Sequence, residues 1–164
     1  MRKNISTKEK ETNFLVLKGE KVPERIGKIL TTTTQTLTGF TFNTLANWTD
    51  CVRIDPEGKL VKNDYIKTVL RVGDKFVFPG DDESIALVRD LLNRFPFLQD
   101  KLQPRWIDPS KLDIRMNFFA FDEKVIFYSG SGSSIRGVLI KNKSLAQSFR
   151  SLCLFLWENA NSIS

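Results

Sequence analysis

The sequence predicts a single α/β domain with a mostly parallel or mixed central sheet and helices on both faces. One observation is the unit formed by a helical pattern over residues 60–72, the stop signal Gly73 and an apolar strand over 75–79, an order typical of parallel sheets. A second is the stretch 112–161, where three short strand patterns precede a helix with apolar residues every three or four positions. The length of 164 residues fits one domain with a substantial core.

The first third of the chain begins with a polar segment. Residues 1–12 lack apolar periodicity and are predicted to be flexible, or to be the remnant of a linker. A short strand is expected over 14–17, and a helix from Pro23, which suits a first helical turn. We expect this helix to continue to about Thr36, because one face stays apolar as far as Leu37. The threonines at 31–34 weaken a helix and leave a short strand as the alternative.

The middle of the chain alternates turn signals with apolar periodicity. A strand over 39–42 precedes Asn43, which can cap a short helix carrying Leu45 and Trp48. Residues 53–59 form a turn-rich connection before the helix over 60–72. After the strand over 75–79, the remaining elements are an acidic helix start at 81–83, a helix over 83–95 and a strand over 104–108.

The closing stretch carries the strongest pattern. Its first strand ends at Phe121 and is apolar on nearly both faces there, as expected for a strand covered on two sides. A turn over 122–124, a strand over 125–128 and a glycine-serine loop over 129–134 follow. After a third strand, a helix begins at Ser144. Its apolar face comprises Leu145, Phe149, Leu152, Cys153, Leu156 and Trp157.

This stretch resembles the second half of a phospholipase-D-like domain, in which a strand with the pattern His-x-Lys-x4-Asp runs through a turn into Gly-Ser. Placing the aspartate of that pattern on Asp122 puts Arg115 at the histidine and Asn117 at the lysine. The closing helix, and the strand, helix and strand that open the domain, are similar to the effector domain of TrmB-like transcriptional regulators. The resemblance covers about residues 13–161 and implies a phospholipase-D-like fold.

Phospholipase D chemistry requires histidine as nucleophile and as acid. The chain contains no histidine, so catalysis of that type is excluded, and we expect no enzyme and no catalytic residue. Cys51 and Cys153 are far apart in sequence and have no histidine partner, so we expect no metal and no cofactor. Cys153 lies in the apolar stripe of the last helix, where a buried free thiol is expected.

The resemblance implies a non-catalytic effector or sensor module that binds a ligand or dimerises. We therefore expect self-association as a homodimer and an anionic small ligand, with DNA binding supplied by an upstream domain that this chain lacks. The sequence shows no signal peptide and no apolar stretch of roughly 20 residues, the length of a membrane span, so a cytoplasmic location is expected.

The resemblance also indicates a ligand site. Arg115 could hold a phosphate or carboxylate, Asn117 could orient it, and Asp122 completes the row. The alternative is that these are polar strand positions followed by a hairpin turn. Ser131 and Ser133 belong to a loop whose backbone could cradle an anion beside Arg136. A plain flexible loop is the alternative there.

The net charge of +6 favours an anionic partner. A nucleic-acid-binding module would use Arg136, Lys141, Lys143 and Arg150, although the lysines also fit a solvated turn before the last helix. The tryptophans at 48, 106 and 157 could stack on bases or pack in the core or in a dimer. A third expectation is docking to acidic lipids or to a protein partner, as in degenerate phospholipase-D-like domains.

Overall fold

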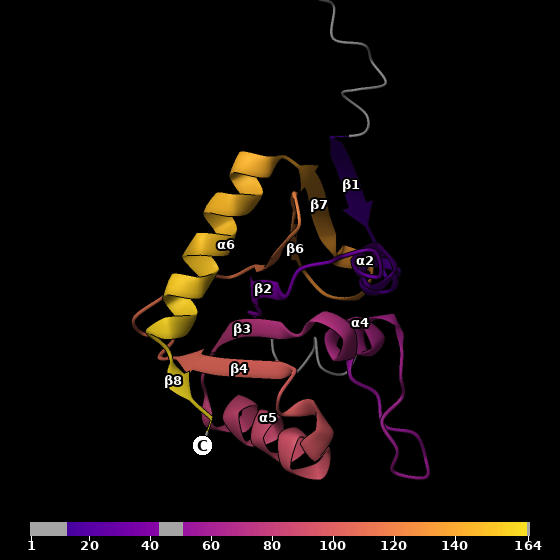
Figure 1. Cartoon of the computed structure of the whole chain (residues 1–164), viewed down its shortest axis with the longest axis vertical. Helices are drawn as coiled ribbons and strands as arrows, with labels where there is room; N and C mark the ends of the chain where they lie inside the picture. The colour runs from indigo at the N-terminus through magenta and orange to yellow at the C-terminus, as the bar shows by residue number, and fades with distance from the viewer. Residues whose placement is uncertain (1–12, 43–50, 164) are drawn as a thin grey trace, which may run out of the picture.

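The computed structural model describes residues 13–42 and 51–163 (Figure 1). The segment 1–12 and the short helix predicted after Asn43 lie outside the described residues. The core of the fold is an eight-stranded sheet in the order β1-β7-β6-β5-β2-β3-β4-β8. The strands are β1 (Phe14–Lys18), β2 (Leu37–Phe40), β3 (Asp74–Pro79), β4 (Leu102–Ile107), β5 (Asn117–Phe121), β6 (Lys124–Ser129), β7 (Arg136–Lys141) and β8 (Asn161–Ser162).

The sheet is mixed, which confirms the predicted α/β class. Strands β2, β3 and β4 are parallel neighbours, and all other neighbouring pairs run antiparallel. The α-helices among the described residues are α2 (Val22–Leu30), α4 (Asp64–Val72), α5 (Asp82–Arg94) and α6 (Lys143–Glu158). Two short 3₁₀ turns, η1 (Pro96–Leu98) and η2 (Gly132–Ser134), complete the elements. No helix in these two described ranges has the length and apolarity of a membrane span.

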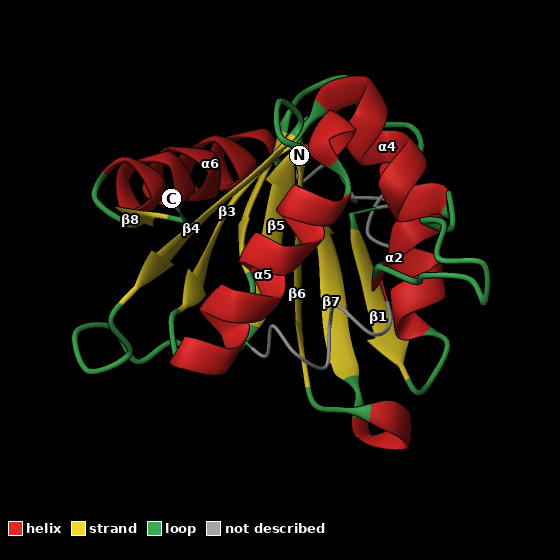
Figure 2. Cartoon of the chain, turned by 90° about the horizontal axis from the view of Figure 1, so that it is seen from below, coloured by secondary structure: helices red, strands yellow, loops and turns green. Residues whose placement is uncertain are grey.

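Helices cover both faces of the sheet (Figure 2). Helix α6 lies across β2, β3, β5 and β6 on one face, whereas α2, α4 and α5 lie on the other. The alternation of side chains in β3 explains how one strand serves both layers. Phe76 and Phe78 pack into the cluster under α4 and α5, and Val77 packs into the cluster under α6.

The layer under α6 is held by aromatic side chains. The Phe118 ring stacks on Phe40 with centroids 5.8 Å apart and meets Phe149 of α6 edge-on at 5.8 Å. Phe127 contacts the same Phe149 ring at 5.0 Å. All five residues of β5 are buried, as expected for a strand covered on two sides. Cys153 is a buried free thiol in this layer, as predicted.

Helix α2 ends at Leu30, so the prediction of a helix to Thr36 is wrong. Residues 31–36 form a loop held by side chains from distant elements. The Asp122 carboxylate accepts hydrogen bonds from the Thr34 amide at 3.1 Å and the Gln35 amide at 3.2 Å. The Arg71 guanidinium donates to the carbonyls of Thr31 and Thr33, and Arg150 donates to the Thr36 carbonyl at 2.8 Å. These tertiary bonds replace the helical ones.

Other boundaries also differ from the prediction. Helix α4 begins at Asp64 rather than residue 60, because the Asn63 side chain caps it by accepting the Ile66 amide at 2.9 Å. Strand β5 begins only at Asn117, so Arg115 precedes the strand that was expected to contain it. Helix α6 is capped by Asn142, which accepts the Leu145 amide at 2.9 Å, and not by Ser144.

Candidate ligand site between α2 and α4

The predicted row of Arg115, Asn117 and Asp122 does not converge on one site. Asn117 and Asp122 lie at opposite ends of β5, roughly 17 Å apart at about 3.3 Å per strand residue. Asn117 is 3% exposed, and its Oδ1 accepts the Phe42 amide at 2.8 Å. Arg115 is exposed and pairs with Asp113 at 2.8 Å. The Asp122 carboxylate is hydrogen-bonded to backbone amides of the loop over 31–36.

The glycine-serine loop shares an end of the sheet with Asn117. The register pairs Asn117 with Tyr128, and Ser129 with Arg136, so the loop between β6 and β7 lies at the start of β5. The Arg136 guanidinium donates to the carbonyls of Ser133 at 3.0 Å and Ile135 at 2.8 Å, which ties it to its own loop. The Ser131 amide donates to Ser134 Oγ at 3.2 Å. Anion binding by this loop stays a prediction.

The basic side chains proposed for nucleic acid divide into two groups. Arg136 begins β7 and Lys141 ends it, so the two lie at opposite ends of that strand. Lys141, Lys143 and Lys124 gather at the far end, where Lys124 and Lys141 are direct cross-strand neighbours. Arg150 is half-buried and bonded to the Thr36 carbonyl.

The two described tryptophans take part in packing. Trp157 Nε1 donates to the Gln103 carbonyl at 2.8 Å. The Arg105 guanidinium stacks on the Trp157 ring in a cation–π contact, with its central carbon 3.6 Å from the ring centroid. Trp106 Nε1 donates to the Ser162 carbonyl at 3.1 Å. These contacts fix α6 and β8 onto β4. Trp48 lies outside the described residues.

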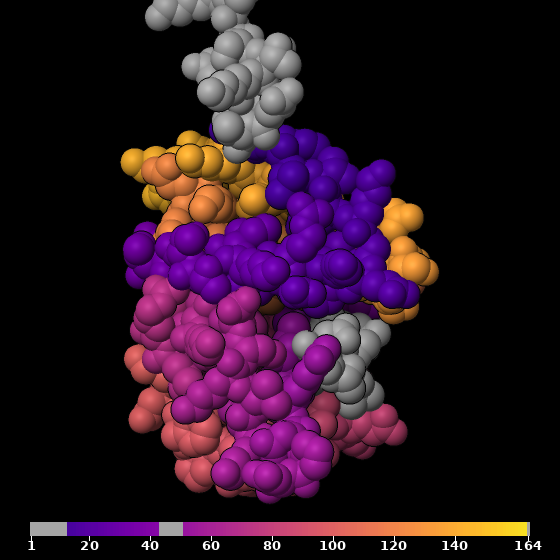
Figure 3. All heavy atoms as spheres, turned by 90° about the vertical axis from the view of Figure 1, so that its right-hand side faces the viewer, coloured from indigo at the N-terminus to yellow at the C-terminus, as the bar shows by residue number. Residues whose placement is uncertain are grey.

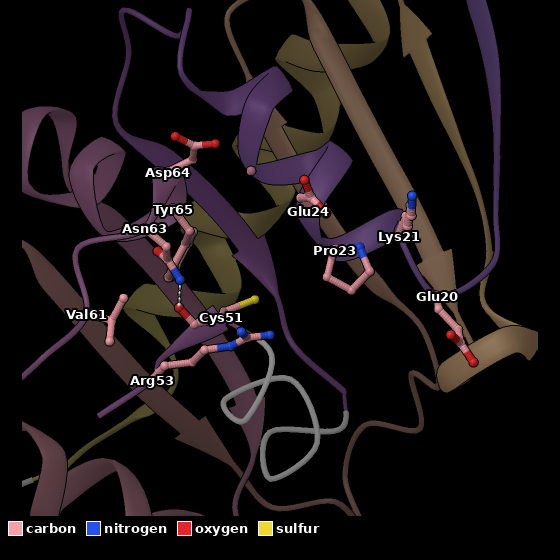
Figure 4. A pocket seen from close by; sticks show the side chains of 11 residues that line it. Glu20, Lys21, Pro23, Glu24, Cys51, Arg53, Val61, Asn63, Asp64 and Tyr65 are labelled. Carbon is pink, nitrogen blue, oxygen red and sulfur yellow. Dashed lines mark hydrogen bonds between the residues drawn. The ribbon is translucent and has the colours of Figure 1, made fainter. Parts of the chain in front are cut away.

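A surface pocket of about 320 Å³ lies between α2, α4 and the segment that leads into α4 (Figure 4). Figure 3 shows this side of the molecule, with the N-terminal segment that contains α2 above the segment that contains α4. The pocket is lined by Glu20, Lys21, Pro23, Glu24, Gly27, Cys51, Arg53, Val61, Asn63, Asp64 and Tyr65. No sequence motif indicates this pocket, because its residues come from three separate segments.

Local hydrogen bonds shape the wall on the α4 side. The Val61 amide donates to the Arg53 carbonyl at 2.8 Å, so the turn over 55–59 brings these two residues together. Asn63 Nδ2 donates to the Cys51 carbonyl at 2.7 Å, which joins the start of this segment to the cap of α4 (Figure 4). The turn signals at 53–59 and the capping asparagine were the sequence features that could have indicated this wall.

Close helix packing shapes the opposite wall. Gly27 of α2 faces α4, and an added Cβ atom would be in ordinary van der Waals contact with the Asp64 Cβ, at 3.5 Å. Pro23 stands in the first turn of α2, where its missing amide proton costs no hydrogen bond. The two helices therefore meet at Gly27, which lines the pocket together with the start of α2.

Charges of both signs line the pocket and are not neutralised by one another. Within the described part of the chain, Lys21 and Arg53 take part in no ion pair or side-chain hydrogen bond, and neither do the carboxylates of Glu20 and Asp64. Glu24 pairs with Lys28 at 3.3 Å on the outer surface of α2. Counted over the described residues, the pocket thus presents two cations and two carboxylates that have no partner.

Tyr65 separates the pocket from the core. Its hydroxyl donates to Asp74 Oδ2 at 2.7 Å, and Asp74 is 1% exposed. Burial raises the pKa of Asp74 to about 7, against the opposing effect of the Tyr65 hydrogen bond. Burial, and next the negative charge of Asp74, raise the pKa of Tyr65 well above its usual range. Asp74 Oδ1 has no hydrogen-bond partner among the described residues.

A second, smaller pocket of about 30 Å³ adjoins the first. It shares Cys51 and Tyr65 with the pocket and reaches Thr41 and Tyr128 in the interior. The site can therefore bind a small polar molecule at the surface and contact the core through Tyr65. In residues 13–42 and 51–163 no group of three or more acidic or cysteine side chains is placed to hold a metal ion.

The sequence matches no protein family and no curated protein. The fold is similar to that of TrmBL2, an archaeal chromatin protein described as showing a novel mode of DNA binding. The TM-score is 0.62 at 16% sequence identity, and the match covers 99% of this chain and 56% of TrmBL2. The chain therefore spans about half the length of TrmBL2.

The fold is also similar to that of Nuc from Salmonella typhimurium, a phospholipase D family member. The TM-score is 0.56 at 13% identity, with 91% of this chain and 97% of Nuc covered. These two similarities confirm the predicted likeness to phospholipase-D-like domains and to TrmB-like proteins at the level of the fold.

Proposed function

We propose that this chain is a non-catalytic effector module of a transcriptional regulator, and that it binds a small ligand between α2 and α4. The observation that carries the proposal is the pocket of about 320 Å³, whose lining has charges of both signs without a partner among the described residues. A pocket of this size is at the lower end of the range that holds small molecules in proteins. The fold shared with TrmBL2 supports the regulatory context.

The non-catalytic part of the proposal rests on Arg115, Asn117 and Asp122, the positions that the phospholipase-D-like pattern assigns to its conserved residues. The chain contains no histidine, Asn117 is used to hold the Phe42 amide, and Arg115 lies outside the strand. A nucleophile with an adjacent base is the arrangement that covalent catalysis needs, and the row offers none.

Ligand binding is tested by a thermal-shift screen of common metabolites on the purified chain, because a ligand that binds only the folded state raises its melting temperature. The variant Val61→Trp fills the mouth of the pocket, and Ile54→Trp places the same ring on the same turn outside it. We expect a compound that stabilises the wild type and Ile54→Trp but not Val61→Trp. Equal stabilisation of all three proteins, or of none, contradicts the proposal.

Self-association is the second part of the module that we propose. Strand β1 is an edge strand, and Val16 is directly opposite Val138, which lies opposite Phe127 under α6. Phe14 and Val16 therefore face the α6 side of the sheet, beyond the strands that α6 covers. Exposed apolar side chains on an edge strand are a common site of pairing with another chain. The exposed apolar side chains of β1 on this side are Phe14 at 53% and Val16 at 51%.

Nucleic-acid binding is a second candidate function, favoured by the lysines at the end of β7. Lys124 and Lys141 are directly opposite, an arrangement of like charges that destabilises a sheet unless an anion offsets it. Fluorescence anisotropy with labelled duplex DNA over a range of salt concentrations tests this function. Binding that weakens steeply with salt and is reduced in Lys141→Gln/Lys143→Gln, but not in Lys101→Gln/Lys111→Gln, supports it. Binding to anionic vesicles alone would instead favour a lipid-docking module.

A further inference from the structure

We propose that the pocket between α2 and α4 is specific for a zwitterion, an α-amino acid with a small apolar side chain. This inference rests on the proposed function, because it names the ligand class of the same site. It starts from the observation that each wall of the pocket carries a cation and a carboxylate. Lys21 and Glu20 stand at the start of α2, whereas Arg53 and Asp64 belong to the segment and helix on the other side (Figure 4).

The balance of charge in the lining disfavours anionic and neutral polar ligands. The lining has the cations Lys21 and Arg53 and the carboxylates Glu20, Glu24 and Asp64, so it is not net positive. A nucleotide or sugar phosphate would meet more carboxylates than cations in it. A neutral sugar would leave the free charges of both walls without counterparts. Because Glu24 pairs with Lys28, the remaining charges of the described lining are two of each sign, which a zwitterion can complement.

Arg53 is the side chain suited to the carboxylate of the ligand. Its guanidinium has no other partner within the described residues, and its planar fork can bind a carboxylate through two parallel hydrogen bonds. In Figure 4 the Arg53 side chain extends from its own wall beside Cys51. The ammonium group would then be held by Glu20 or Asp64, whose carboxylates are also without a partner.

Apolar surface between the charges would take the side chain of the amino acid. Pro23 stands on one wall and Val61 on the other. A volume of about 320 Å³ holds one amino acid and does not hold a folded peptide. Size, charge and apolar surface therefore agree on the same class of ligand.

Isothermal titration calorimetry of the full chain with the common α-amino acids tests the proposal. The tightest binder is then compared with its two matched analogues, the carboxylic acid that lacks the amino group and the amine that lacks the carboxylate. We expect each analogue to bind about tenfold or more weakly, which is about 1.4 kcal/mol. Equal binding of either analogue, or a thermal-shift hit of another class while every amino acid fails, overturns the zwitterion and leaves the ligand site in place.

Substitutions in the pocket test separately how the carboxylate and the ammonium group of the ligand are bound. Arg53→Gln should weaken the amino acid about tenfold and leave the amine analogue unaffected, whereas Arg25→Gln, an exposed arginine of α2 outside the pocket, should bind as the wild type does. At least one of Glu20→Gln and Asp64→Asn should weaken the amino acid and spare the carboxylic acid analogue. Unchanged binding in Arg53→Gln, or in both acid variants, overturns the proposal. If no compound of any class binds in a Val61-dependent manner, the proposed function itself fails.

Discussion

Replacing Asp74 with asparagine should remove a strong pH dependence from the stability of this fold. The carboxyl group is buried at the start of β3, where burial raises its pKa from the ordinary 3.8 to about 7. Between these pH values the folded chain keeps the proton and the unfolded chain releases it, so a rise in pH favours unfolding. The contribution is fully present below pH 3.8 and is lost as the pH rises to about 7.

The magnitude follows from the two pKa values. The gap between 3.8 and about 7, at about 1.4 kcal/mol per pKa unit, corresponds to about 4 kcal/mol. This is a large part of the roughly 5–15 kcal/mol that stabilises a typical domain. Asparagine does not ionise, and its side-chain oxygen can still accept the Tyr65 hydroxyl. The free energy of unfolding of Asp74→Asn, relative to the wild type, should therefore rise by about 4 kcal/mol between pH 4 and pH 8.

Urea unfolding followed by circular dichroism measures this difference at each pH, because the free energy falls linearly with denaturant. Asp90→Asn on the exposed side of α5 is the matched control, and its curve should stay parallel to that of the wild type. A curve for Asp74→Asn that is also parallel to the wild type would refute the reasoning, because it would mean that Asp74 ionises equally in both states.

Three further predictions concern the loop, the core and the edge of the sheet. Asp122→Gly keeps the positive φ of 48° accessible but removes the carboxylate that holds the loop over 31–36. The free energy of unfolding, measured with urea, should therefore fall by about 2–3 kcal/mol, and Glu123→Gly is the control. Phe118→Ala empties the centre of the aromatic layer and should cost about 3–5 kcal/mol; a loss below about 1 kcal/mol would contradict the packing. Val16→Lys should lower the association constant in analytical ultracentrifugation, whereas the same change at the exposed Ile54 should not.

The elements that could be predicted from the sequence are those whose signal is local. The strand over 75–79 follows Gly73 directly, and the turn at Asp122 joins β5 to β6 as its residues indicate. The prediction of a helix to Thr36 was wrong because the signal that ends this helix is not local. The carboxylate that holds its last residues in a loop is 88 positions away in sequence at Thr34. No window of residues around the threonines contains that information.

The candidate site likewise depends on contacts between residues that are distant in the sequence. The row of Arg115, Asn117 and Asp122 came from spacing in a family pattern, yet the rise of a strand already places its ends far apart. The pocket depends on the approach of α2 to α4 at Gly27, which is a tertiary contact without a motif of its own. Free charges such as Arg53 look like ordinary surface residues until the walls that they line are known.

Strand β1 has a consequence for the order in which the chain assembles. Strands β5, β6 and β7 lie within residues 117–141 and need only short loops to close, whereas β1 pairs with β7 across 118 positions from Lys18 to Arg136. Closing so long a loop carries a larger entropic penalty, so β1 should join a sheet that its neighbours have already formed. By the same reasoning, its amides should exchange with deuterated solvent through a partial opening that leaves β5–β7 protected. Anything attached to the N-terminus is thus joined to the strand that docks last and is released first.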